Sequence, residues 1–426
     1  MKCVGHYRAH ATRSTFYVIL SDAKPVAYNK PMTHRTDFPI GASVTLAELE
    51  GDLHPLLHRL RAAEPVSWLP VLQGWLVTRR DDAIAVMRDA QTYTVDHPGF
   101  STAQVVGPSM LSLDGPAHLR HRSPFERPFH LEAVQNRFRQ PVADTINTLL
   151  ATLVTQGHAE LRRDFAGPVA VQTMIAALGL QDVTIAAVLG WYDAIVDAVT
   201  QVTAGEPVSP AGRAAFAVLR DHLLPVLRQD PTANLLAMAS GDAAGLSEEQ
   251  IVANAAVLLF GGIETTEGMI ANAFYFLLTD PALLQEVRRN PALLPAVLEE
   301  TLRLEPAAAV VDRYAVRDLV LGQAAIKAGD LVRVSLTAAN RDPATFADPD
   351  RCDPLRPNLR SHVTFAQGPH VCLGLHLARL EAHLALAQAL ATLPDLQVVP
   401  TAAAWQAAQP RGLVFRKPQA LYVQWR

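Results

Sequence analysis

One cysteine of the chain stands in surroundings that favour a reactive sulfur. Cys372 lies within the segment Phe365-Ala-Gln-Gly-Pro-His-Val-Cys-Leu-Gly374, immediately before a predicted helix. The glycines on both sides of it allow a tight turn and the close approach of a flat ligand. The free N–H groups and the positive dipole end of the following helix favour a thiolate over a thiol. A thiolate in this position is a suitable soft ligand for iron.

Two other interpretations of Cys372 compete with iron ligation. An isolated cysteine in a loop is more often a buried and inert side chain. Zinc is the second alternative, because His370 and His376 lie close to Cys372 in the sequence. Structural zinc usually has four ligands in paired spacings, and no second Cys/His pair lies nearby. The residues by themselves therefore disfavour zinc and leave iron ligation and an inert cysteine open.

An acid and a hydroxyl lie in the middle of a long predicted helix. Gly261 and Gly262 precede Glu264 and Thr265 there, and each glycine costs about 1 kcal/mol relative to alanine in a helix interior. Such a cost indicates a close approach of another element or a local distortion of the helix. The spacing places Gly261, Glu264 and Thr265 on one face, where an acid and a hydroxyl can form a short proton path. The alternative is simple packing through small residues, with Glu264 reaching solvent.

Several charged residues have spacings that suit ion pairing or anion binding. Glu300 and Arg303 are three apart and share a helix face, although such a pair is usually exposed and contributes only a few tenths of a kcal/mol. Arginine and histidine side chains are suitable partners for carboxylate groups of a ligand. His118 and Arg122, one helical turn apart, suit this second role, although each alone is more often a solvated surface residue.

Taken together, these motifs resemble those of the cytochrome P-450 superfamily. The cysteine segment matches the signature Phe-x-x-Gly-x-His-x-Cys-x-Gly at every fixed position. Three further features also match in family order: the six residues 261–266, the Glu-x-x-Arg pattern of Glu300 and Arg303, and Arg356. The resemblance extends from about residue 45 to the C-terminus. Two departures are Ala366, where the family usually has Gly, and Cys352, where it usually has Phe. The resemblance is to the bacterial-type soluble members.

The resemblance implies a cofactor and a set of site residues. The cofactor is haem b (iron protoporphyrin IX), with the Cys372 thiolate as its axial ligand. Residues that contact haem or its propionates are then Phe365, Ala366, Gly374, His118, Arg122, Arg313 and His370. The family's oxygen-activation motif corresponds to Gly261, Gly262, Glu264 and Thr265, with Thr265 assisting dioxygen activation and Glu264 relaying protons. Glu300, Arg303 and Arg356 correspond to a buried charge network behind the cysteine loop.

The implied activity is that of a monooxygenase. Such an oxidoreductase inserts one oxygen atom from O2 into a hydrophobic small organic substrate, by hydroxylation or epoxidation. Because the chain ends soon after the helix that follows Cys372, we expect its electrons to come from a separate ferredoxin or flavodoxin and its reductase. We expect docking on the cysteine side, with Arg120, His121 and Arg379 supplying positive charge. The alternatives are a peroxide-driven or rearranging haem-thiolate enzyme and a non-catalytic haem- or small-molecule-binding protein.

The elements that must position these residues are mostly helical. Apolar spacing predicts helices over 46–63, 81–90 and much of 117–280, a helix capped by Ser247 that runs to about Asp280, and a last one over 375–393. A hairpin is predicted from 66–72 and 75–78, with short strands at 310–314, 319–321 and 331–335. The segments 93–113 and 202–212 are predicted to be a long loop and a flexible connection. The fold class is mainly α (α+β), which the resemblance specifies as a triangular helical prism with small β-sheets.

Composition limits the remaining possibilities. The chain has 426 residues, of which half are hydrophobic and 18% charged, with a net charge of −4. This balance allows a large core with an apolar pocket, predicted to be lined by 93–113, 256–260, 307–311 and 413–414, and excludes a nucleic-acid footprint. Three scattered cysteines fit a reducing compartment. No transmembrane helix or signal peptide is predicted. We expect a cytoplasmic monomer with a flexible arm over 1–40, a start at Met1 or Met32, and one haem domain over 41–426.

Overall fold

The computed structural model describes residues 37–203, 206–230, 234–242 and 245–426. Most of the predicted N-terminal arm, including Met32, lies outside the described residues. Phe38 falls within the predicted arm, yet it is 5% exposed, and its ring packs edge-on against Trp75 at a centroid distance of 5.2 Å.

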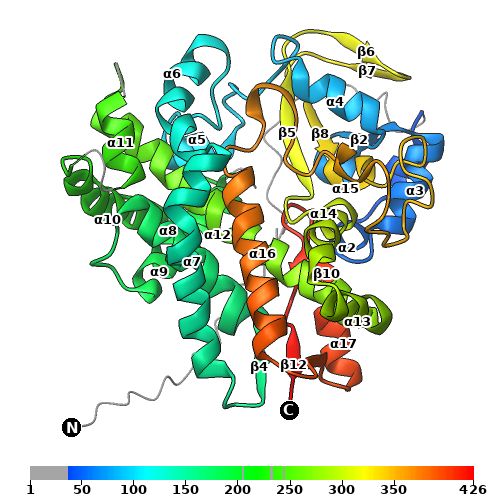
Figure 1. Cartoon of the computed structure of the whole chain (residues 1–426). Coiled ribbons are helices and arrows are strands. Elements are labelled where there is room, and N and C mark those ends of the chain that lie inside the picture. Colours follow the sequence, from blue (N-terminus) through cyan, green and yellow to red (C-terminus); the bar gives the residue numbers. More distant parts are fainter. Residues whose placement is uncertain (1–36, 204–205, 231–233, 243–244) are drawn as a thin grey trace.

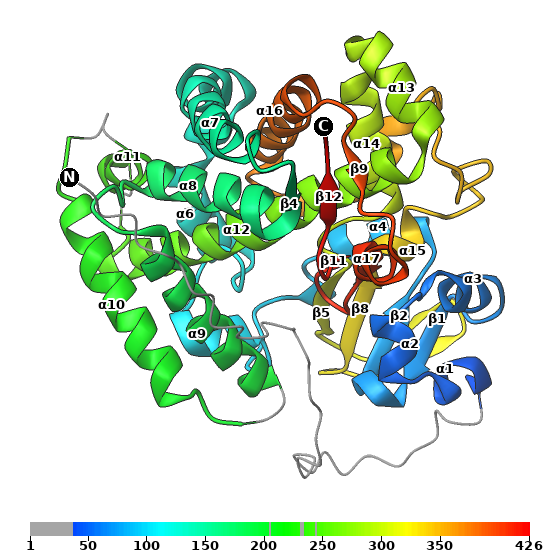
Figure 2. The same ribbon diagram turned by 90° about the horizontal axis from the view of Figure 1, so that it is seen from below.

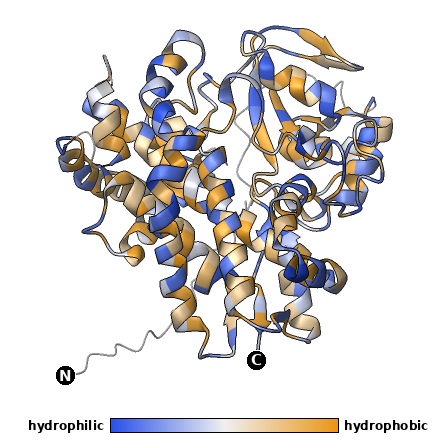
Figure 3. Cartoon of the chain, in the orientation of Figure 1, coloured by the Kyte–Doolittle hydropathy of each residue, from blue (hydrophilic) through white to orange (hydrophobic). Residues whose placement is uncertain are grey.

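Helices make up most of the molecule (Figure 1), as predicted. The main helices are α1 (Pro39–Ser43), α2 (Leu46–Glu50), α3 (His54–Ala63), α4 (Arg80–Arg88), α5 (Ser101–Val106), α6 (Gly115–Glu126), α7 (Leu131–Leu153), α8 (Gly167–Leu178), α9 (Ile185–Thr203), α10 (Pro210–Val226), α11 (Leu235–Asp242), α12 (Glu248–Thr279), α13 (Pro281–Arg289), α14 (Leu294–Leu304), α15 (Leu336–Ala339), α16 (Leu375–Thr392) and α17 (Ala402–Ala408). Figure 3 shows hydrophobic and hydrophilic residues interspersed along most of these helices, the pattern of helices that surround a core.

The strands are short and form several small sheets. They are β1 (Val66–Leu69), β2 (Gly74–Val77), β3 (Tyr93–Thr94), β4 (His158–Glu160), β5 (Val310–Ala315), β6 (Leu319–Leu321), β7 (Ala324–Ile326), β8 (Leu331–Ser335), β9 (Gln397–Val398), β10 (Pro410–Arg411), β11 (Lys417–Pro418) and β12 (Tyr422–Gln424). The largest sheet has the order β1-β2-β8-β5-β3. Its β1–β2 pair is the predicted hairpin, antiparallel with Val66 opposite Val77. The short strands after residue 396 were not predicted, because two- and three-residue strands have no measurable periodicity.

Helix α12 crosses the whole molecule (Figure 2). Its 32 residues correspond to about 48 Å at about 1.5 Å per residue. The predicted capping box is present: Ser247 Oγ accepts from the Gln250 N–H at 3.3 Å, and Gln250 Oε1 accepts from the Ser247 N–H at 3.0 Å. The expected distortion at the glycine pair is absent, and α12 is helical throughout. A β-carbon on Gly262 would lie 2.3 Å from Met174 Sδ of α8, so close helix packing explains this glycine.

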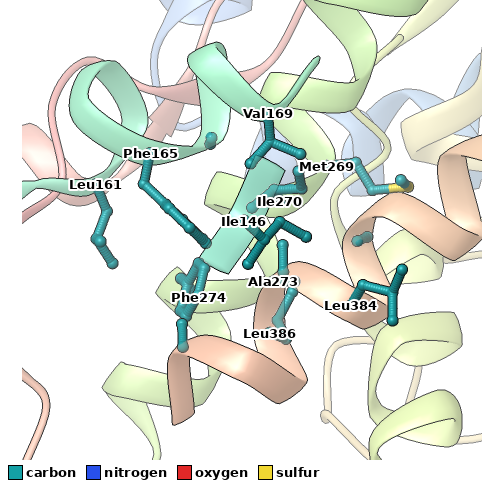
Figure 4. Packing of buried hydrophobic residues seen from close by; sticks show 14 of the residues in the cluster. Ile146, Leu161, Phe165, Val169, Met269, Ile270, Ala273, Phe274, Leu384 and Leu386 are labelled. Atoms are coloured by element: carbon teal, nitrogen blue, oxygen red, sulfur yellow. The ribbon is translucent and has the colours of Figure 1, made fainter. Parts of the chain in front are cut away.

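The largest hydrophobic cluster lies where α7, α8, α12 and α16 meet. Ile146 of α7, Phe274 of α12 and Leu384 of α16 converge there (Figure 4). Phe165 packs against Phe274 with a ring centroid distance of 6.2 Å. This cluster holds α12 and α16 against each other. Helix α12 carries the predicted oxygen-activation motif, and α16 is the helix that follows Cys372.

Two local predictions need correction. The helix predicted over 46–63 is two helices, α2 and α3, because the chain turns at Gly51. The 93–113 segment is not wholly a loop. It contains β3 and α5, and Val105 and Val106 of α5 are buried in a cluster with residues of α9. In the predicted 202–212 connection, residues 204–205 lie outside the described residues.

A buried acid on α16 gives the first prediction. Glu381 is 2% exposed, and burial raises its pKa well above the ordinary value, although a hydrogen bond with Thr173 lowers it. An unfolded glutamate titrates near 4.3, so the stabilising contribution of neutral Glu381 is complete below about pH 4.3. It is lost as the pH rises towards the folded pKa, at a slope of up to about 1.4 kcal/mol per pH unit.

We therefore expect Glu381→Gln to remove part of the fall in the free energy of unfolding between acid and alkaline pH, as measured by urea unfolding. The exposed Glu132→Gln is the matched control and should leave the profile unchanged. Equal pH profiles for wild type and Glu381→Gln would contradict the assignment of a neutral buried acid.

Candidate functional site

The cysteine loop is held by its own backbone. The Cys372 N–H donates to the Phe365 carbonyl oxygen at 2.8 Å, and Gly374 is the residue before the first turn of α16. Burial raises the pKa of the Cys372 thiol, whereas a hydrogen bond from the Gly374 N–H and the charges of Arg122 and Arg379 lower it. Burial outweighs these effects, and the net shift of the pKa is upward. The loop presents the sulfur at a helix N-terminus beside one N–H donor and two cations.

Two residues of the loop have left-handed backbone conformations. Gly368 has φ 76°, and a β-carbon there would lie 2.7 Å from the Met87 carbonyl oxygen, so glycine is required. Ala366 has φ 59°, although its methyl group disfavours this region by about 1–2 kcal/mol. The family-atypical alanine is thus accommodated with backbone strain, and the loop keeps its turn.

This strain gives the second prediction. Ala366→Gly should raise the free energy of unfolding by about 1 kcal/mol, because glycine adopts positive φ without the penalty of a β-carbon. The larger entropy that glycine loses on folding offsets part of this gain. Urea unfolding of the two proteins measures the difference. A matched control is Ala378→Gly within α16, which should destabilise by about 1 kcal/mol. A loss of stability in Ala366→Gly as well would contradict the strain argument.

The middle of α12 lies close to the cysteine loop. Leu373, next to Cys372, packs against the same cluster that contains Leu259 and Ile263 of α12. A β-carbon placed on Gly261 would meet no atom within 4 Å, so the helix leaves room at this point. The Thr265 hydroxyl donates to the Gly261 carbonyl oxygen at 2.5 Å.

Glu264 does not reach solvent. It is 3% exposed. The Tyr192 hydroxyl of α9 donates to Glu264 Oε2 at 2.5 Å, and Lys417 Nζ of β11 lies 2.7 Å from Glu264 Oε1. The carboxylate is therefore held by side chains of α9 and β11, and the alternative in which Glu264 reaches solvent is wrong.

The contacts of Glu264 continue towards the molecular surface. Lys417 Nζ also lies 3.1 Å from Glu267 Oε2, and Glu267 Oε1 accepts from Arg162 Nη1 at 2.8 Å. Burial lowers the pKa of Lys417, but the charges of Glu267 and Glu264 raise it by more than burial lowers it, so the net shift is upward. Burial and the Glu264 charge raise the pKa of Tyr192 well above its ordinary value. Sequence reasoning missed Tyr192 and Lys417, since both are distant in the chain and no motif marks them.

Three of the four predicted anion-binding residues, His118, Arg313 and His370, gather around Asp114, which sequence reasoning did not single out. Asp114 Oδ1 lies 2.8 Å from His370 Nε2, and its charge acts on both His118 and Arg313. Burial raises the pKa of Asp114, but hydrogen bonds from His370, Thr94 and the Val95 N–H lower it to well below its ordinary value. The His118 and His370 rings lie 4.4 Å apart. Arg122 is nearly buried and donates to Glu126 at 2.9 Å.

Two of these donors fit an anionic ligand. His118 Nε2 and Arg313 Nη2 are buried and have no hydrogen-bond partner among the described residues, which is costly unless a ligand supplies acceptors. Burial, then the charges of His370 and Arg122, lower the pKa of His118 to about 4, so it is a neutral donor. Two carboxylates of haem are acceptors of the required kind, and Cys372 offers the thiolate. The residues therefore fit haem.

Zinc finds no support in this geometry. Among the described parts of the chain, no group of three or more His, Cys, Asp or Glu side chains is arranged to hold a metal ion. The alternative set of His370, Cys372 and His376 is therefore not a zinc site of the usual kind.

The predicted buried charge network is present behind the loop. Arg303 makes two hydrogen bonds of 2.7 Å to the Glu300 carboxylate, and both side chains are 0% exposed. Arg356 Nε adds a contact of 3.3 Å to Glu300 Oε1. Cys352 is half-buried, and burial followed by the Glu300 charge raises the pKa of its thiol to about 12, in keeping with a structural cysteine.

The predicted docking cations are only partly available. Arg120 is exposed. His121 is 1% exposed and its Nδ1 lies 3.1 Å from Asn254 Nδ2, so it cannot meet a partner. Arg379 is paired with Glu299. Of the predicted pocket lining, Ala256 and Ala309 are buried in the core, whereas Phe260 and Val311 are half-buried.

Comparison with known proteins places this geometry in one family. A family model described as cytochrome P-450 matches residues 227–421. Cytochrome P-450 107B1 of Saccharopolyspora erythraea is 33% identical over 374 residues, covering 82% of this chain and 89% of the relative. Mycinamicin IV hydroxylase/epoxidase of Micromonospora griseorubida is 33% identical over 425 residues, covering 95% and 100% respectively.

A solved structure agrees with the fold. P-450BioI, in complex with an acyl carrier protein ligated to hexadec-9Z-enoic acid, superposes with a TM-score of 0.78 at 26% identity. The match covers 88% of this chain and 99% of that one.

Proposed function

The chain belongs to the cytochrome P-450 family of monooxygenases, and from this we propose that it inserts one oxygen atom from O2 into a hydrophobic small organic substrate. The reaction is a hydroxylation or an epoxidation. The observation that carries the proposal is the pair of unpartnered buried donors, on His118 and Arg313, in the same structure as a cysteine loop whose sulfur lies at a helix N-terminus.

We propose that the cofactor is haem b, held by the Cys372 thiolate. His118, Arg122, Arg313 and His370 hold its propionates, and Phe365, Ala366 and Gly374 form the loop beside it. Bound in this way, haem supplies the reductive activation of O2, and the thiolate promotes cleavage of the O–O bond. The contribution of Gly261 and Gly262 is close packing, which leaves space on one side of α12 and seats α8 on the other.

The proton supply is assigned to Glu264 and Thr265. The Thr265 hydroxyl has one acceptor, the Gly261 carbonyl oxygen, and its oxygen can accept a further hydrogen bond. Glu264 is connected through Lys417 to Glu267, which is itself paired with Arg162. A proton can thus pass from the surface to Glu264 without bulk water entering the core. Because Tyr192 and Lys417 each engage one oxygen of the Glu264 carboxylate, proton transfer from Glu264 to Thr265 requires one of these contacts to break.

This assignment gives the third prediction. Thr265→Ala should lower the amount of product formed per electron pair by roughly tenfold, about 1.4 kcal/mol, with the lost electrons appearing as hydrogen peroxide. Lys417→Met should slow turnover and raise its solvent isotope effect, because the connection to Glu267 is broken. The neighbouring buried Thr266→Ala is the control and should stay coupled. Wild-type coupling in Thr265→Ala would remove Thr265 from the proton supply, and a wild-type turnover rate and solvent isotope effect in Lys417→Met would remove Lys417.

The remaining features of the proposal follow from charge and composition. We propose a separate ferredoxin or flavodoxin with its reductase as electron source, a monomeric state, a cytoplasmic location, and no nucleic-acid or membrane partner. One helix, Ile185–Val202 within α9, is long and apolar enough to span a bilayer by length and composition. It packs against α10 and α5, with Ile195 and Ala198 buried, although only 28% of the span is buried.

Dependence on oxygen and on electron donor tests the function. Compounds that shift the Soret band of the purified protein are identified first, and their turnover is then measured with O2 and reduced ferredoxin. A monooxygenase requires both. Turnover with peroxide alone, or without any oxidant, would favour the peroxide-driven or rearranging alternative. Binding without turnover under any of these conditions would favour a non-catalytic haem- or small-molecule-binding protein.

A further inference from the structure

A second buried ion pair lies beside the Glu300–Arg303 pair, and no motif used above accounts for it. Glu299 of α14 is 6% exposed and accepts two hydrogen bonds from Arg379 of α16, from Nε at 2.5 Å and Nη2 at 2.9 Å. Burial raises the pKa of Glu299, but hydrogen bonds from His362 and Arg379 lower it to about 2. The pair therefore stays ionised at any pH at which the protein is used, and it joins α14 to α16.

The same arginine covers the first residue of the cysteine loop. The guanidinium carbon of Arg379 lies 4.5 Å from the centre of the Phe365 ring, the geometry of a cation–π contact. The Phe365 carbonyl oxygen is the acceptor for the Cys372 N–H. Arg379 thus contacts the ring of Phe365, and the backbone of Phe365 holds the Cys372 N–H.

His362 completes the arrangement from the other side. Its Nε2 lies 3.0 Å from Glu299 Oε2, and its Nδ1 accepts from the Thr364 N–H at 3.4 Å. Since Nδ1 is an acceptor, the ring proton is on Nε2 and is donated to Glu299. The Thr364 hydroxyl in turn donates to the Leu302 carbonyl oxygen at 2.8 Å. The segment that leads into the cysteine loop is therefore fixed to α14 at two points: His362 contacts Glu299, and Thr364 contacts the Leu302 carbonyl oxygen.

This geometry argues against a role for Arg379 in redox-partner docking alone. Its side chain is 29% exposed, whereas that of Glu299 is 7% exposed. A guanidinium that makes two hydrogen bonds and stacks on a ring uses the planar shape of arginine, and a lysine cannot reproduce it. A cation kept only to attract a redox partner needs its charge and not this shape.

We propose that Arg379 is a positioning residue for Cys372: locked by Glu299 and His362, it holds the Phe365 ring and thereby the backbone acceptor of the cysteine N–H. The inference rests on the proposed role of Cys372 as the haem ligand. It differs from the docking role that the sequence suggested for Arg379. Glu299 separates the two roles, because it is buried and cannot contact a partner protein.

The test compares Arg379→Gln, Arg379→Lys and Glu299→Gln in the haem-loaded full chain. The first readout is amide hydrogen exchange of the peptide that covers 365–374. We expect exchange of the Cys372 amide to be about tenfold faster in Arg379→Gln and Glu299→Gln, corresponding to about 1.4 kcal/mol. The second readout is the fraction of reduced protein under carbon monoxide that shows the red-displaced, thiolate-type band, which should fall in both variants. Arg289→Gln is the control, because the Arg289 side chain is 73% exposed and pairs only with the half-exposed Glu286.

The outcomes separate positioning from docking. A positioning role predicts that Arg379→Lys resembles Arg379→Gln, since the bidentate contact is lost in both. If Arg379→Lys behaves as wild type and Arg379→Gln only raises the KM for reduced ferredoxin, with exchange unchanged in Glu299→Gln, the proposal is overturned. A wild-type protein without the thiolate-type band would refute the proposed function instead, and the exchange rates would still decide the role of Arg379.

Discussion

A Cys372→Ser variant is expected to lose the red-displaced absorption of the reduced carbon monoxide complex, and its oxygenase activity should fall to the background of haem-free protein. A serine oxygen does not supply the electron density that a thiolate gives to iron. The change is nearly isosteric. The loop keeps the hydrogen bond from the Cys372 N–H to the Phe365 carbonyl oxygen, and a serine oxygen can accept from the Gly374 N–H in place of the sulfur. The variant should therefore fold, as judged by circular dichroism.

The chain offers a matched control for this experiment. Cys352 is the other described free cysteine, and its thiol is kept protonated by burial and by the nearby Glu300. Cys352→Ser should retain the absorption band and the activity. A band that survives in Cys372→Ser, or is lost only in Cys352→Ser, would refute the assignment of the ligand.

The second large effect is expected on stability. Arg303→Leu should lower the free energy of unfolding by about 3–5 kcal/mol, because it leaves the Glu300 carboxylate buried with a single weaker cationic contact from Arg356. Arg303 also donates to the carbonyl oxygens of Asn340 and Pro349 at 2.9 and 2.7 Å, and these acceptors would lose their donor. Urea or thermal unfolding of the haem-loaded protein measures the change.

A second arginine with the same spacing serves as the control. Arg289 and Glu286 are also three apart on a helix, but their side chains are 73% and 50% exposed and the shortest N···O distance is 3.8 Å. Arg289→Leu should change the free energy of unfolding by less than about 0.5 kcal/mol. Similar losses in both variants would mean that burial does not determine the strength of the Glu300–Arg303 pair.

The sequence was most informative where structure depends on neighbouring residues. The hairpin of β1 and β2, the capping box at Ser247 and the start of α16 after Gly374 were all predicted. Each depends on turn residues, caps or apolar spacing within about ten positions. The cysteine loop belongs to the same class, because its shape comes from a few residues with unusual backbone angles.

The glycine pair shows where this reasoning was incomplete. The cost of two glycines in a helix predicted either a close approach of another element or a local distortion, and the structure shows the close approach for Gly262, with Met174 of α8. A sequence shows that a small residue is tolerated at a position. Only the packed structure shows which neighbour requires it, since close packing leaves no room for a β-carbon there.

The sequence by itself thus determined the family and the helical fold class, and it predicted Cys372 as the haem ligand. The tertiary structure decided the partners of the charged groups: Lys417 and Tyr192 for Glu264, Asp114 for His370, and Glu299 for Arg379. These residues are far apart in the chain and come together only when helices and strands pack. Because a buried charge must find its partner within that packing, no local pattern can specify which one it will be.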